Sequence, residues 1–419
     1  MDSTTHFRRS LEPTLLEAAG EFPAVVLTGP RQSGKTTLLK RLFGDSHRYL
    51  SLELPDVKAA ALADPRSFLE AFPPPVIFDE VQYAAELLPY IKERIDAARE
   101  RSGQYVLSGS QNLLLVESVT ESLAGRAAVL RLLPLSSQEV AERPHRVGPW
   151  WTPVASAAEV APIEASEAPT ARPAFGELWE SFLRGGYPEL AAQPGRNFQL
   201  WHASYLQTYV ERDVRTLRQV GDLSQFQSFL RVLAARSGQL LNLSDVGRDL
   251  GLAANTCKAW LSVLEASYQV FVLRPYFANV GKRLVKTPKI YLTDVGSLCY
   301  LSGLRDAGHA AAGPLGGAIL ETAVLSQIVR TLVHRGEEPR VYFWRTSAGV
   351  EVDFIVELGG RLVPLEVKLS ATPRPSMASG IRAFQQDLGT QASAGYVVHP
   401  GDVHLPLGSQ ASALPFSDL

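Results

Sequence analysis

The first 140 residues alternate short apolar runs with segments of helical periodicity. The runs AVVLTG, PVIFDE and QYVLSGS each end in glycine, an acidic residue or serine. Short continuous apolar runs that end in this way are typical of strands buried on both faces of a parallel sheet. The pattern therefore predicts an α/β fold with a parallel sheet in this part of the chain.

The rest of the chain divides into segments with different patterns. Residues 151–173 are rich in Ala, Pro and Glu and contain few large apolar side chains, so we expect a flexible insertion there. A helical pattern covers residues 175–237, and a helix, a turn and a second helix follow it. The last part is mixed, with one helix expected near 317–335 and strands after it.

The composition argues against a generally basic, a disulfide-rich and a membrane-spanning protein. The 419 residues carry a net charge of −2, so any contact with DNA must come from a local basic patch. The two cysteines, Cys257 and Cys299, lack the spacing of a zinc site or a disulfide framework, which suits a reducing compartment. The first residues show no apolar signal segment, and no run approaches 18 apolar residues. We therefore expect a cytoplasmic protein that does not span a membrane.

The most specific motif follows the first apolar run. GPRQSGKT, from Gly29 to Thr36, fits the phosphate-binding loop pattern G-x-x-x-x-G-K-[ST]. Its glycines let backbone N–H groups wrap around phosphates, Lys35 reaches the β- and γ-phosphates, and the Thr36 hydroxyl ligates Mg²⁺. We expect ATP to contact Gly29, Pro30, Arg31, Gln32, Ser33, Gly34, Lys35, Thr36 and Thr37.

Residues at the ends of the next strands complete this predicted site. Asp79 would hold the Mg²⁺ through water, and Glu80 would orient the attacking water. Ser110, followed by residues 111–112, would sense the γ-phosphate, although an ordinary polar strand end fits the same residues. Arg126 is predicted to act in trans as an arginine finger, with an ordinary surface arginine as the equal alternative.

Residues 238–300 fit a winged helix. Ser244 is the expected N-cap of the first helix, Gly251 marks the turn, and Lys258 lies on the second helix. The strands QVFVL and KIYLTD would form the wing. Positive charge there suits contacts with DNA phosphates, and packing between subunits is the alternative use of such a module. The expected basic residues of the wing are Lys282, Arg283, Lys286 and Lys289.

The stretch EVDFIVELGGRLVPLEVK, residues 351–368, predicts two strands joined by a Gly-Gly turn. Asp353, Glu366 and Lys368 follow the spacing of restriction-endonuclease-like folds, in which two carboxylates hold a divalent ion and the lysine orients the attacking water. Glu321, in the preceding helix, lies where such folds often add an acidic residue. The alternative is an ordinary hairpin whose charged side chains share the solvated face.

The chain also contains a set of longer motifs: GPRQSGKTTLL, VIFDEVQ, LSGSQNLLL, SLAGRAAVLRLLPLSSQEV, FLRGGYPEL and YVERDV, with FWR, GVEVDF and EVK near its end. Together they resemble the prokaryotic AAA-type ATPases fused to an uncharacterised C-terminal domain. The resemblance implies a nuclease-like fold for that domain. The expected domains are an AAA-type ATPase domain (1–140), a flexible insertion (141–174), a helical domain (175–237), a winged helix (238–300) and a nuclease-like α/β domain (301–419).

Two hypotheses for function follow. In the first, a Mg²⁺-dependent ATPase acts on DNA, either by remodelling it or by metal-dependent cleavage through the C-terminal domain. Its catalytic residues would be Glu80, Arg126, Asp353, Glu366 and Lys368. In the second, an ATP-switched regulatory or signalling NTPase binds DNA or a partner protein, and its nuclease-like domain is inactive. Both use ATP and Mg²⁺, with Mn²⁺ as an alternative ion at the C-terminal site, and both predict a homo-oligomer.

Overall fold

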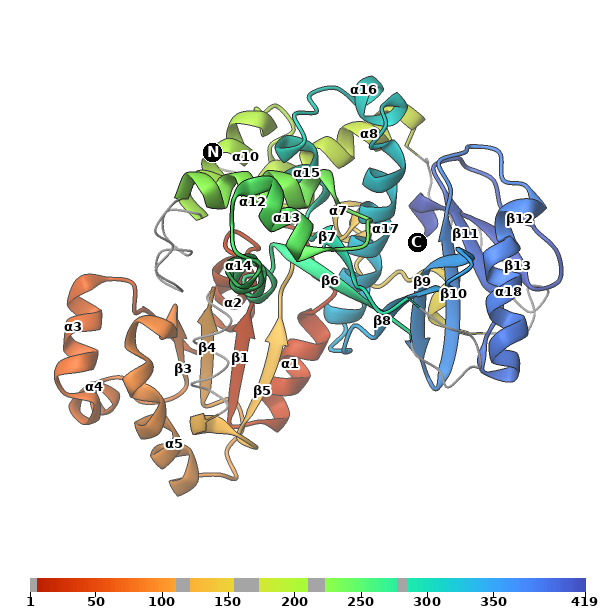
Figure 1. The fold of residues 1–419 in the computed structure, drawn as a ribbon. Helices are drawn as coiled ribbons and strands as arrows, with labels where there is room; N and C mark the ends of the chain where they lie inside the picture. Colours follow the sequence, from red (N-terminus) through yellow and green to blue (C-terminus); the bar gives the residue numbers. More distant parts are fainter. Residues whose placement is uncertain (1–5, 111–120, 154–172, 210–222, 277–284) are drawn as a thin grey trace.

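The structure, a computed structural model, describes residues 6–110, 121–153, 173–209, 223–276 and 285–419. Figure 1 shows an N-terminal sheet between helices, a group of helices from the middle of the chain, and a C-terminal sheet. The long helix α17 (Gly316–Val333) lies between the group of helices and the C-terminal sheet (Figure 1). The expected helix near 317–335 is thus confirmed.

Five parallel strands form the N-terminal sheet, in the order β2-β3-β4-β1-β5. The three apolar runs form β1 (Ala24–Thr28), β3 (Val76–Asp79) and β4 (Tyr105–Gly109), and every residue in them is buried. The sequence-based prediction of buried parallel strands is confirmed. The two outer strands are β2 (Arg48–Ser51) and β5 (Ala127–Arg131), which are partly exposed because each lies at an edge of the sheet.

Alternate side chains of the central strands pack into two separate layers. Val26 and Phe78 belong to one apolar layer, and Val25 and Ile77 belong to the other, as the two-residue period of a strand requires. Helices cover both faces, which is why these strands contain almost no polar residues. The first layer includes residues of α3 (Pro55–Ala63), α4 (Pro65–Ala71), η1 (Val81–Leu87) and α5 (Leu88–Ala97), and the second includes residues of α1 (Glu12–Glu21) and α2 (Lys35–Phe43).

The middle of the chain is helical, as predicted. Its helices are α7 (Ser137–Val140), η2 (Pro149–Trp151), α8 (Phe175–Arg184), α9 (Pro188–Ala192), α10 (Phe198–Tyr209), α12 (Leu223–Ala235), α13 (Leu243–Leu250), α14 (Ala254–Ala266), α15 (Val295–Leu301) and α16 (Ala307–Ala312). Helices α13 and α14 follow one another across the expected turn at Gly251, which has the left-handed conformation (φ 66°). The predicted N-cap is wrong: the side chain of Asn242, not Ser244, accepts the backbone N–H bonds at the start of α13.

The C-terminal sheet has eight strands in the order β12-β13-β11-β10-β9-β8-β6-β7. The predicted hairpin is present, with β9 and β10 antiparallel around Gly359 and Gly360, both at positive φ. The two strands expected as a wing, β6 and β7, pair with each other, and β6 also pairs with β8. They therefore join the C-terminal sheet and cross the expected domain boundary at residue 300. The strands are β6 (Val270–Pro275), β7 (Lys289–Leu292), β8 (Val341–Arg345), β9 (Glu351–Leu358), β10 (Arg361–Val367), β11 (Gly395–His399), β12 (Leu405–Pro406) and β13 (Ala411–Pro415), with η5 (Pro375–Ala378), α18 (Ser379–Leu388), η6 (Gly389–Gln391) and η7 (Phe416–Asp418) between or after them.

Two expectations for surface segments change. Lys289 was expected on a DNA-facing wing, but it is only 4% exposed. The prediction that it contacts a DNA phosphate is therefore wrong. Lys282 and Arg283 lie outside the described residues, and Lys286 is exposed. In the expected insertion at 141–174, Trp150 is fully buried and its indole N–H donates to the Leu419 carbonyl at 3.4 Å, so the packed part of the chain extends to this residue. Residues 154–172 lie outside the described part.

Among the described helices, α17 alone has the length and apolar composition of a membrane-spanning segment, with a mean hydropathy of 1.2. However, 83% of this stretch is buried inside the protein. A helix of this kind is also what the centre of a protein core requires.

Candidate functional site

The phosphate-binding loop joins β1 to α2, and its conformation depends on two glycines. Gly29 has a φ of 145°, and a Cβ atom there would lie 2.1 Å from the Leu132 carbonyl oxygen. Gly34, with a φ of 94°, adopts the left-handed conformation directly before α2. The Lys35 ammonium donates to the carbonyl oxygens of Gly29 and Pro30, each at 2.9 Å. The predicted loop therefore curls around the ammonium at the start of α2.

Asp79 is the centre of the hydrogen bonds beside this loop. The Thr36 hydroxyl donates to its Oδ2 at 2.7 Å, and the Tyr49 hydroxyl donates to the same oxygen at 2.7 Å. Ser108 donates to Oδ1. The sequence predicted the pair Thr36–Asp79, but it missed Tyr49 and Ser108. Their signal was present, since both lie on strands that flank β3, where buried polar side chains need a partner.

Tyr49 remains a donor because its hydroxyl is hard to ionise. Burial, the hydrogen bond to Asp79 and the charge of that carboxylate together raise the pKa of Tyr49 well above its ordinary value. A protonated hydroxyl next to Asp79 fixes the orientation of the carboxylate. The second oxygen of that carboxylate is held in the same way by Ser108.

Glu80 extends from the end of β3 in an unusual backbone conformation. Its φ of 57° is positive, which is uncommon for a residue with a side chain and often occurs at functional sites. Ser110 donates to Glu80 Oε2 at 3.0 Å, and Gln82 donates to the same oxygen. The structure thus brings the predicted Glu80 and Ser110 together, whereas residues 111–112 lie outside the described part of the chain.

Two cavities adjoin the loop. One, of about 360 Å³, is lined by Lys35, Thr36 and Glu80, and by Tyr205, Thr208 and Tyr209 of α10. The other, of about 550 Å³, is lined by His6, Phe7 and Arg9 and by Pro188 of α9, among others. Gln32, Gly34 and Thr37 of the loop line both cavities. The loop therefore separates a polar cavity near Glu80 from a larger one beside the N-terminal segment.

Arg9 holds the back of the loop and was not predicted. It is 4% exposed, and its guanidinium donates to the carbonyl oxygens of Ser33 and Leu133 at 2.8 and 2.6 Å. Its Nε lies 3.2 Å from the carboxylate of Glu139, which is fully buried. Arg9 thus connects the phosphate-binding loop to a buried carboxylate on α7.

The carboxylate of Glu139 also contacts His334, the residue that directly follows α17. His334 Nδ1 lies 3.1 Å from Glu139 Oε1, while His334 Nε2 accepts the Leu133 backbone N–H at 3.0 Å. Since Nε2 must carry a lone pair to accept this bond, the ring is neutral with its proton on Nδ1. Burial lowers the pKa of His334, which agrees with a neutral ring. A chain of contacts therefore runs from Ser33 through Arg9 and Glu139 to the end of α17.

Arg126 lies at the start of β5, at the opposite end of the strands from the loop. The register pairs Ala24 with Ala127, so the length of β1 separates Arg126 from the loop of its own chain, roughly 16 Å for five residues. Its guanidinium makes two bonds to Asp96, at 2.6 and 3.0 Å. Arg126 could therefore contact a nucleotide only on another subunit, and only after it exchanges Asp96 for that nucleotide.

The C-terminal residues Glu321, Asp353, Glu366 and Lys368 lie in one cluster, and a further lysine that was not expected there contacts part of it. Lys289 Nζ is 3.1 Å from Glu321, 2.5 Å from Glu351 and 4.0 Å from Asp353. Lys368 Nζ is 2.7 Å from Glu366, which is 4% exposed. Of the hairpin carboxylates, Glu366 is buried and Asp353 is partly buried, and the Asp353 side chain accepts the Val367 backbone N–H at 2.8 Å.

The charges of this cluster perturb one another. Burial and the neighbouring charge of Asp353 raise the pKa of Glu321 to about 7 and the pKa of Glu366 to about 8. Burial acts to lower the pKa of Lys289, but the carboxylates around it raise that pKa above its ordinary value. Within the described residues, no three His, Cys, Asp or Glu side chains are grouped as ligands of one metal ion.

Comparison with known proteins divides the chain into three matched regions. An AAA domain matches residues 21–141, a domain of unknown function (DUF8612) matches 176–308, and a domain of unknown function (DUF4143) matches 316–419. The AAA match contains the loop, Asp79 at the end of β3, Glu80 after it, Ser110 and Arg126. The N-terminal part is therefore a P-loop ATPase domain of the AAA type, and the C-terminal part is a DUF4143 domain.

Two uncharacterised mycobacterial proteins match almost the whole chain. They are Mb2031c of Mycobacterium bovis and Rv2008c of Mycobacterium tuberculosis, each 32% identical over 410 residues, which is 97% of this chain and 83% of the relative. Among solved structures, the Walker-type ATPase PABY2304 of Pyrococcus abyssi has a TM-score of 0.45 at 16% identity, covering 71% of this chain and 96% of that one. The RuvB Holliday junction branch migration motor of Thermotoga maritima has a TM-score of 0.28 at 16% identity, covering 63% and 86%. TM-scores this low establish no common fold.

Proposed function

The chain belongs to the family of the mycobacterial proteins Mb2031c and Rv2008c and contains an AAA-type ATPase domain, and on this premise we propose that it hydrolyses ATP with Mg²⁺. The observation that carries the proposal is the convergence of Lys35, Thr36, Asp79, Glu80 and Ser110 beside one loop. Groups from the loop and from the ends of two strands meet there. This is the arrangement that phosphoryl transfer to water needs.

Each of these side chains has a distinct role in the proposed reaction. Lys35 exchanges the loop carbonyls for phosphate oxygens, and Glu80 orients the attacking water. Thr36 and Asp79 would hold Mg²⁺, and they fit this ion because a hydroxyl and a carboxylate oxygen face each other at 2.7 Å. When bound, Mg²⁺ neutralises charge on the phosphates. Ser110, which donates to Glu80, couples the water-orienting carboxylate to the end of β4.

The two cavities suit the two ends of a nucleotide. The 360 Å³ cavity contains Lys35, Thr36 and Glu80, so it would take the phosphates. The 550 Å³ cavity is lined by Phe7 and Leu38, among others, and is large enough for a base and ribose. Arg9 supports the loop between the two cavities.

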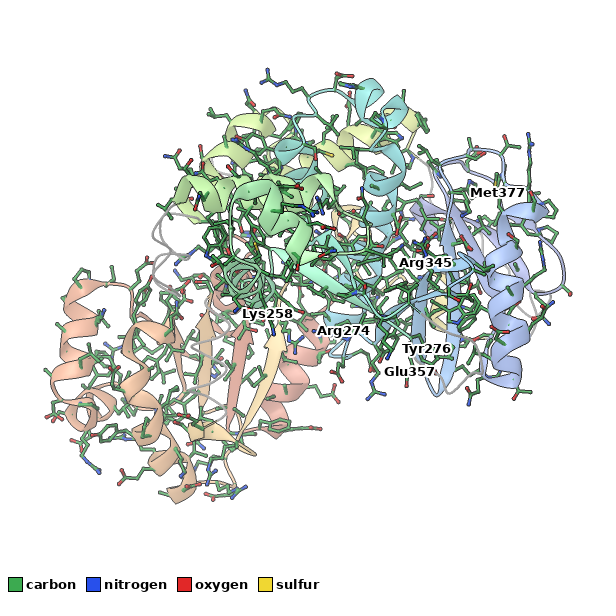
Figure 2. All side chains as sticks on the ribbon, viewed as in Figure 1. Lys258, Arg274, Tyr276, Arg345, Glu357 and Met377 are labelled. Atoms are coloured by element: carbon green, nitrogen blue, oxygen red, sulfur yellow. The ribbon has the colours of Figure 1, made fainter. Side chains whose placement is uncertain are left out.

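The output of ATP hydrolysis has two candidate forms. The first is action on DNA, which Lys258 supports because it is exposed on the second helix of the helix-turn-helix. Figure 2 shows Lys258 and Arg274 in the region between the N-terminal sheet and the C-terminal sheet. Lys286 is a further exposed cation near them in sequence. In this form, ATP-dependent rearrangement of the subunits of a homo-oligomer would change contacts between DNA and the basic residues Lys258, Arg274 and Lys286. Arg126 would act across subunits.

The second form is an ATP-switched regulator with an inactive C-terminal domain, and it is the one we favour. For this domain we propose a restriction-endonuclease-like fold, supported by the order α17, β8, β9, β10, β11 and by the positions of Asp353 on β9 and of Glu366 on β10. The position of Lys289 among the carboxylates favours inactivity over cleavage. The domain limits given by the sequence are kept in this proposal with two changes: the insertion begins after the packed Trp150, and β6 and β7 are shared with the C-terminal sheet.

ATPase activity is tested by two substitutions with different expected results. Lys35→Ala should abolish nucleotide binding, whereas Glu80→Gln should still bind ATP and should release phosphate at least 100-fold more slowly, roughly the loss expected for a group that acts on the attacking water. Glu86→Gln, an exposed carboxylate on η1, serves as the matched control and should behave as the wild type. A Glu80→Gln protein that releases phosphate at the wild-type rate would refute the assigned role of Glu80.

The output is tested on the full chain with DNA of several forms, with and without ATP, in Mg²⁺ or Mn²⁺. The favoured regulator should bind without cutting, and its affinity should depend on the nucleotide. Metal-dependent cleavage that disappears in Asp353→Asn would reject the regulator in favour of the first hypothesis. Absence of DNA binding in every nucleotide state would reject DNA as the partner and leave a protein partner.

A further inference from the structure

A buried lysine lies inside the C-terminal carboxylate cluster. Lys289, the first residue of β7, is 4% exposed, and its ammonium contacts carboxylates from two other elements. Glu321 belongs to α17, and Glu351 and Asp353 belong to β9. An ammonium that is removed from water needs compensating charge, and these carboxylates supply it. Lys289 is thus a component of the cluster, and its sequence position gave no indication of this.

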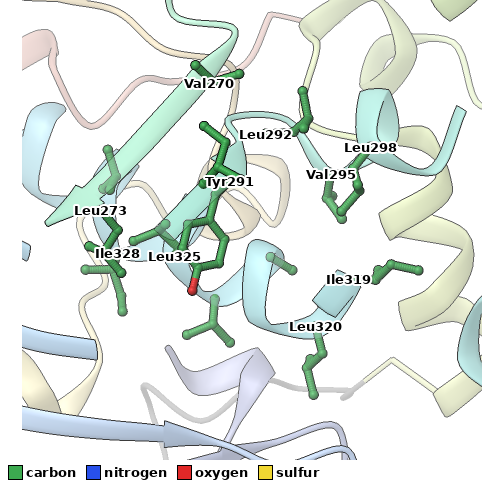
Figure 3. Close-up of a cluster of buried hydrophobic side chains, with 14 of the residues drawn as sticks. Val270, Leu273, Tyr291, Leu292, Val295, Leu298, Ile319, Leu320, Leu325 and Ile328 are labelled. Atoms are coloured by element: carbon green, nitrogen blue, oxygen red, sulfur yellow. The ribbon is translucent and has the colours of Figure 1, made fainter. Parts of the chain in front are cut away.

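Several other polar groups of the cluster also have partners within the chain. Tyr291, two residues after Lys289 on the same face of β7, donates its hydroxyl to Glu321. In Figure 3 the ring of Tyr291 lies among apolar side chains such as Leu325 and Ile328. The other pairs are Arg345 with Glu351 at 3.1 Å, Lys368 with Glu366 at 2.7 Å, and the Val367 backbone N–H with Asp353 at 2.8 Å. Figure 2 shows Arg345 on the side of the C-terminal sheet near α17.

Charge balance in the cluster follows from these pairs. Four carboxylates, those of Glu321, Glu351, Asp353 and Glu366, face the cationic groups of Lys289, Arg345 and Lys368. With all four carboxylates ionised the excess would be one negative charge, and the raised pKa values of Glu321 and Glu366 make it smaller still, which is too little to favour an added divalent cation over the cations that are already present. A bare group of four carboxylates would strongly attract such a cation, but this group is not bare.

We propose that the ammonium of Lys289 is the resident cation of this cluster and that the cluster is closed to divalent metal ions. A divalent ion needs several free oxygen ligands at about 2.0–2.6 Å. Lys289 Nζ already lies 2.5 Å from Glu351, 3.1 Å from Glu321 and 4.0 Å from Asp353, and Glu366 pairs with Lys368 at 2.7 Å, so every carboxylate of the cluster already faces an ammonium group. An ion and the ammonium would repel each other there. The residues of the predicted nuclease centre therefore do not fit a catalytic metal as long as Lys289 stays.

The same contacts give the cluster a structural role. Lys289 and Tyr291 bring the edge strand β7 against α17 through Glu321, and Lys289 also reaches β9 through Glu351. The carboxylates that would bind a metal ion in a nuclease thus connect β7 to α17 and to β9 of the hairpin. This assignment does not depend on the proposed ATPase function, because the two sites share no residue.

Metal binding by the full chain tests the proposal directly. In protein free of nucleotide, Mn²⁺ binding is measured by titration and by the shift in melting temperature. The wild type should bind no Mn²⁺ at the cluster, so Asp353→Asn should leave any Mn²⁺-induced shift unchanged. Lys289→Met should lower the melting temperature by roughly 10 °C, because it leaves buried carboxylates without their cation. Added Mn²⁺ should restore part of that loss by mass action.

Two controls separate the effect of Lys289 from general effects of losing a positive charge. Lys286→Met removes an exposed lysine three residues earlier and should alter neither the melting temperature nor Mn²⁺ binding. The double variant Lys289→Met with Asp353→Asn should lose the rescue by Mn²⁺. If Lys289→Met does not fold, Lys289→Arg is used instead, since it keeps the charge and should remain folded without binding Mn²⁺.

Three results would overturn the proposal. The first is Mn²⁺ stabilisation of the wild type that Asp353→Asn abolishes, because the cluster would then be a metal site with Lys289 in place. The second is a Lys289→Met protein that folds but gains no Mn²⁺ binding, because Lys289 would then not be what excludes the ion. The third is Mn²⁺ binding by Lys289→Arg that depends on Asp353.

Discussion

Replacing Glu139 by Gln should destabilise the protein strongly, although the two side chains have nearly the same shape. Glu139 is fully buried, and its charge compensates the guanidinium of Arg9 at 3.2 Å. Both carboxylate oxygens accept backbone N–H groups, Oε1 from Ser10 at 2.8 Å and Oε2 from Ser136 at 2.9 Å. Whichever way the amide of Gln is turned, its NH₂ group would therefore face an N–H donor.

The size of the effect follows from this geometry. The substitution leaves the buried charge of Arg9 without its partner, and breaking a buried ion pair costs about 3–5 kcal/mol. For a cooperative unit of about 150–250 residues, each kcal/mol lowers the melting temperature by about 2–4 °C, so the expected loss in the unit that contains Glu139 is roughly 10 °C. Thermal unfolding followed by circular dichroism measures it. Glu93→Gln is the matched control, since Glu93 pairs with Arg66 at 3.0 Å but more than half of each side chain is exposed, and this change should leave the melting temperature nearly unchanged.

The pH dependence gives the prediction a second measurement. Burial acts to raise the pKa of Glu139, but the charge of Arg9, the contact with His334 and the backbone hydrogen bond from Ser136 together outweigh burial and hold that pKa well below its ordinary value of 4.5. A carboxyl with a depressed pKa in the folded state stabilises the protein above its unfolded pKa, and this contribution is lost as the pH falls. The difference in stability between wild type and Glu139→Gln should be full at pH 7 and should shrink below pH 4.5. A Glu139→Gln protein as stable as Glu93→Gln at pH 7 would refute the reasoning.

Three further substitutions test other contacts. Tyr49→Phe removes one hydrogen bond to Asp79, worth about 1.5–3 kcal/mol for a charged acceptor, and should raise the Mg²⁺ concentration needed for half-maximal ATPase activity by tenfold or more; an unchanged Mg²⁺ titration would argue against the role of Tyr49. Arg126→Ala should lose ATPase activity and regain part of it when mixed with Lys35→Ala subunits, and a monomer with full activity at high dilution would exclude action in trans. Lys286→Ala should weaken DNA binding equally for all sequences and reduce its salt dependence, and an unchanged salt slope would place the DNA contact elsewhere.

Much of the N-terminal part could be predicted from the sequence because its information is local. The strands are continuous apolar runs, and the loop between Gly29 and Thr36 is a single uninterrupted motif. Asp79 is the last residue of β3 and Glu80 follows it, so the parallel sheet places both next to the loop without further information. The expected convergence of Asp353 and Glu366 was likewise local, since one hairpin carries both residues.

The contacts that the sequence did not reveal are those between distant segments. Arg9 reaches Glu139 across 130 positions, and neither residue belongs to a motif that would mark it as buried. Lys289 was expected at the surface because its charge suited a wing, but β7 packs on α17 and presents alternate residues to Glu321. Propensity and periodicity describe each strand by itself, whereas which face is buried depends on where the sheet places it. The burial of charged residues was predicted least well, because a charged side chain is buried only where an oppositely charged partner lies next to it.

The two sites described here share one element, the helix α17. Its Glu321 is part of the C-terminal cluster, and His334, directly after its last residue, contacts the Glu139 carboxylate that also holds Arg9 and the loop. Thirteen residues of helix separate the two contacts, about 20 Å at 1.5 Å per residue. Coupling between two sites requires an element that both of them bias, and almost every residue of α17 is buried, so it cannot shift at one end without disturbing packing along its length. A change at the phosphate-binding loop that displaces Arg9 therefore acts on the same rigid helix that holds Lys289 in place.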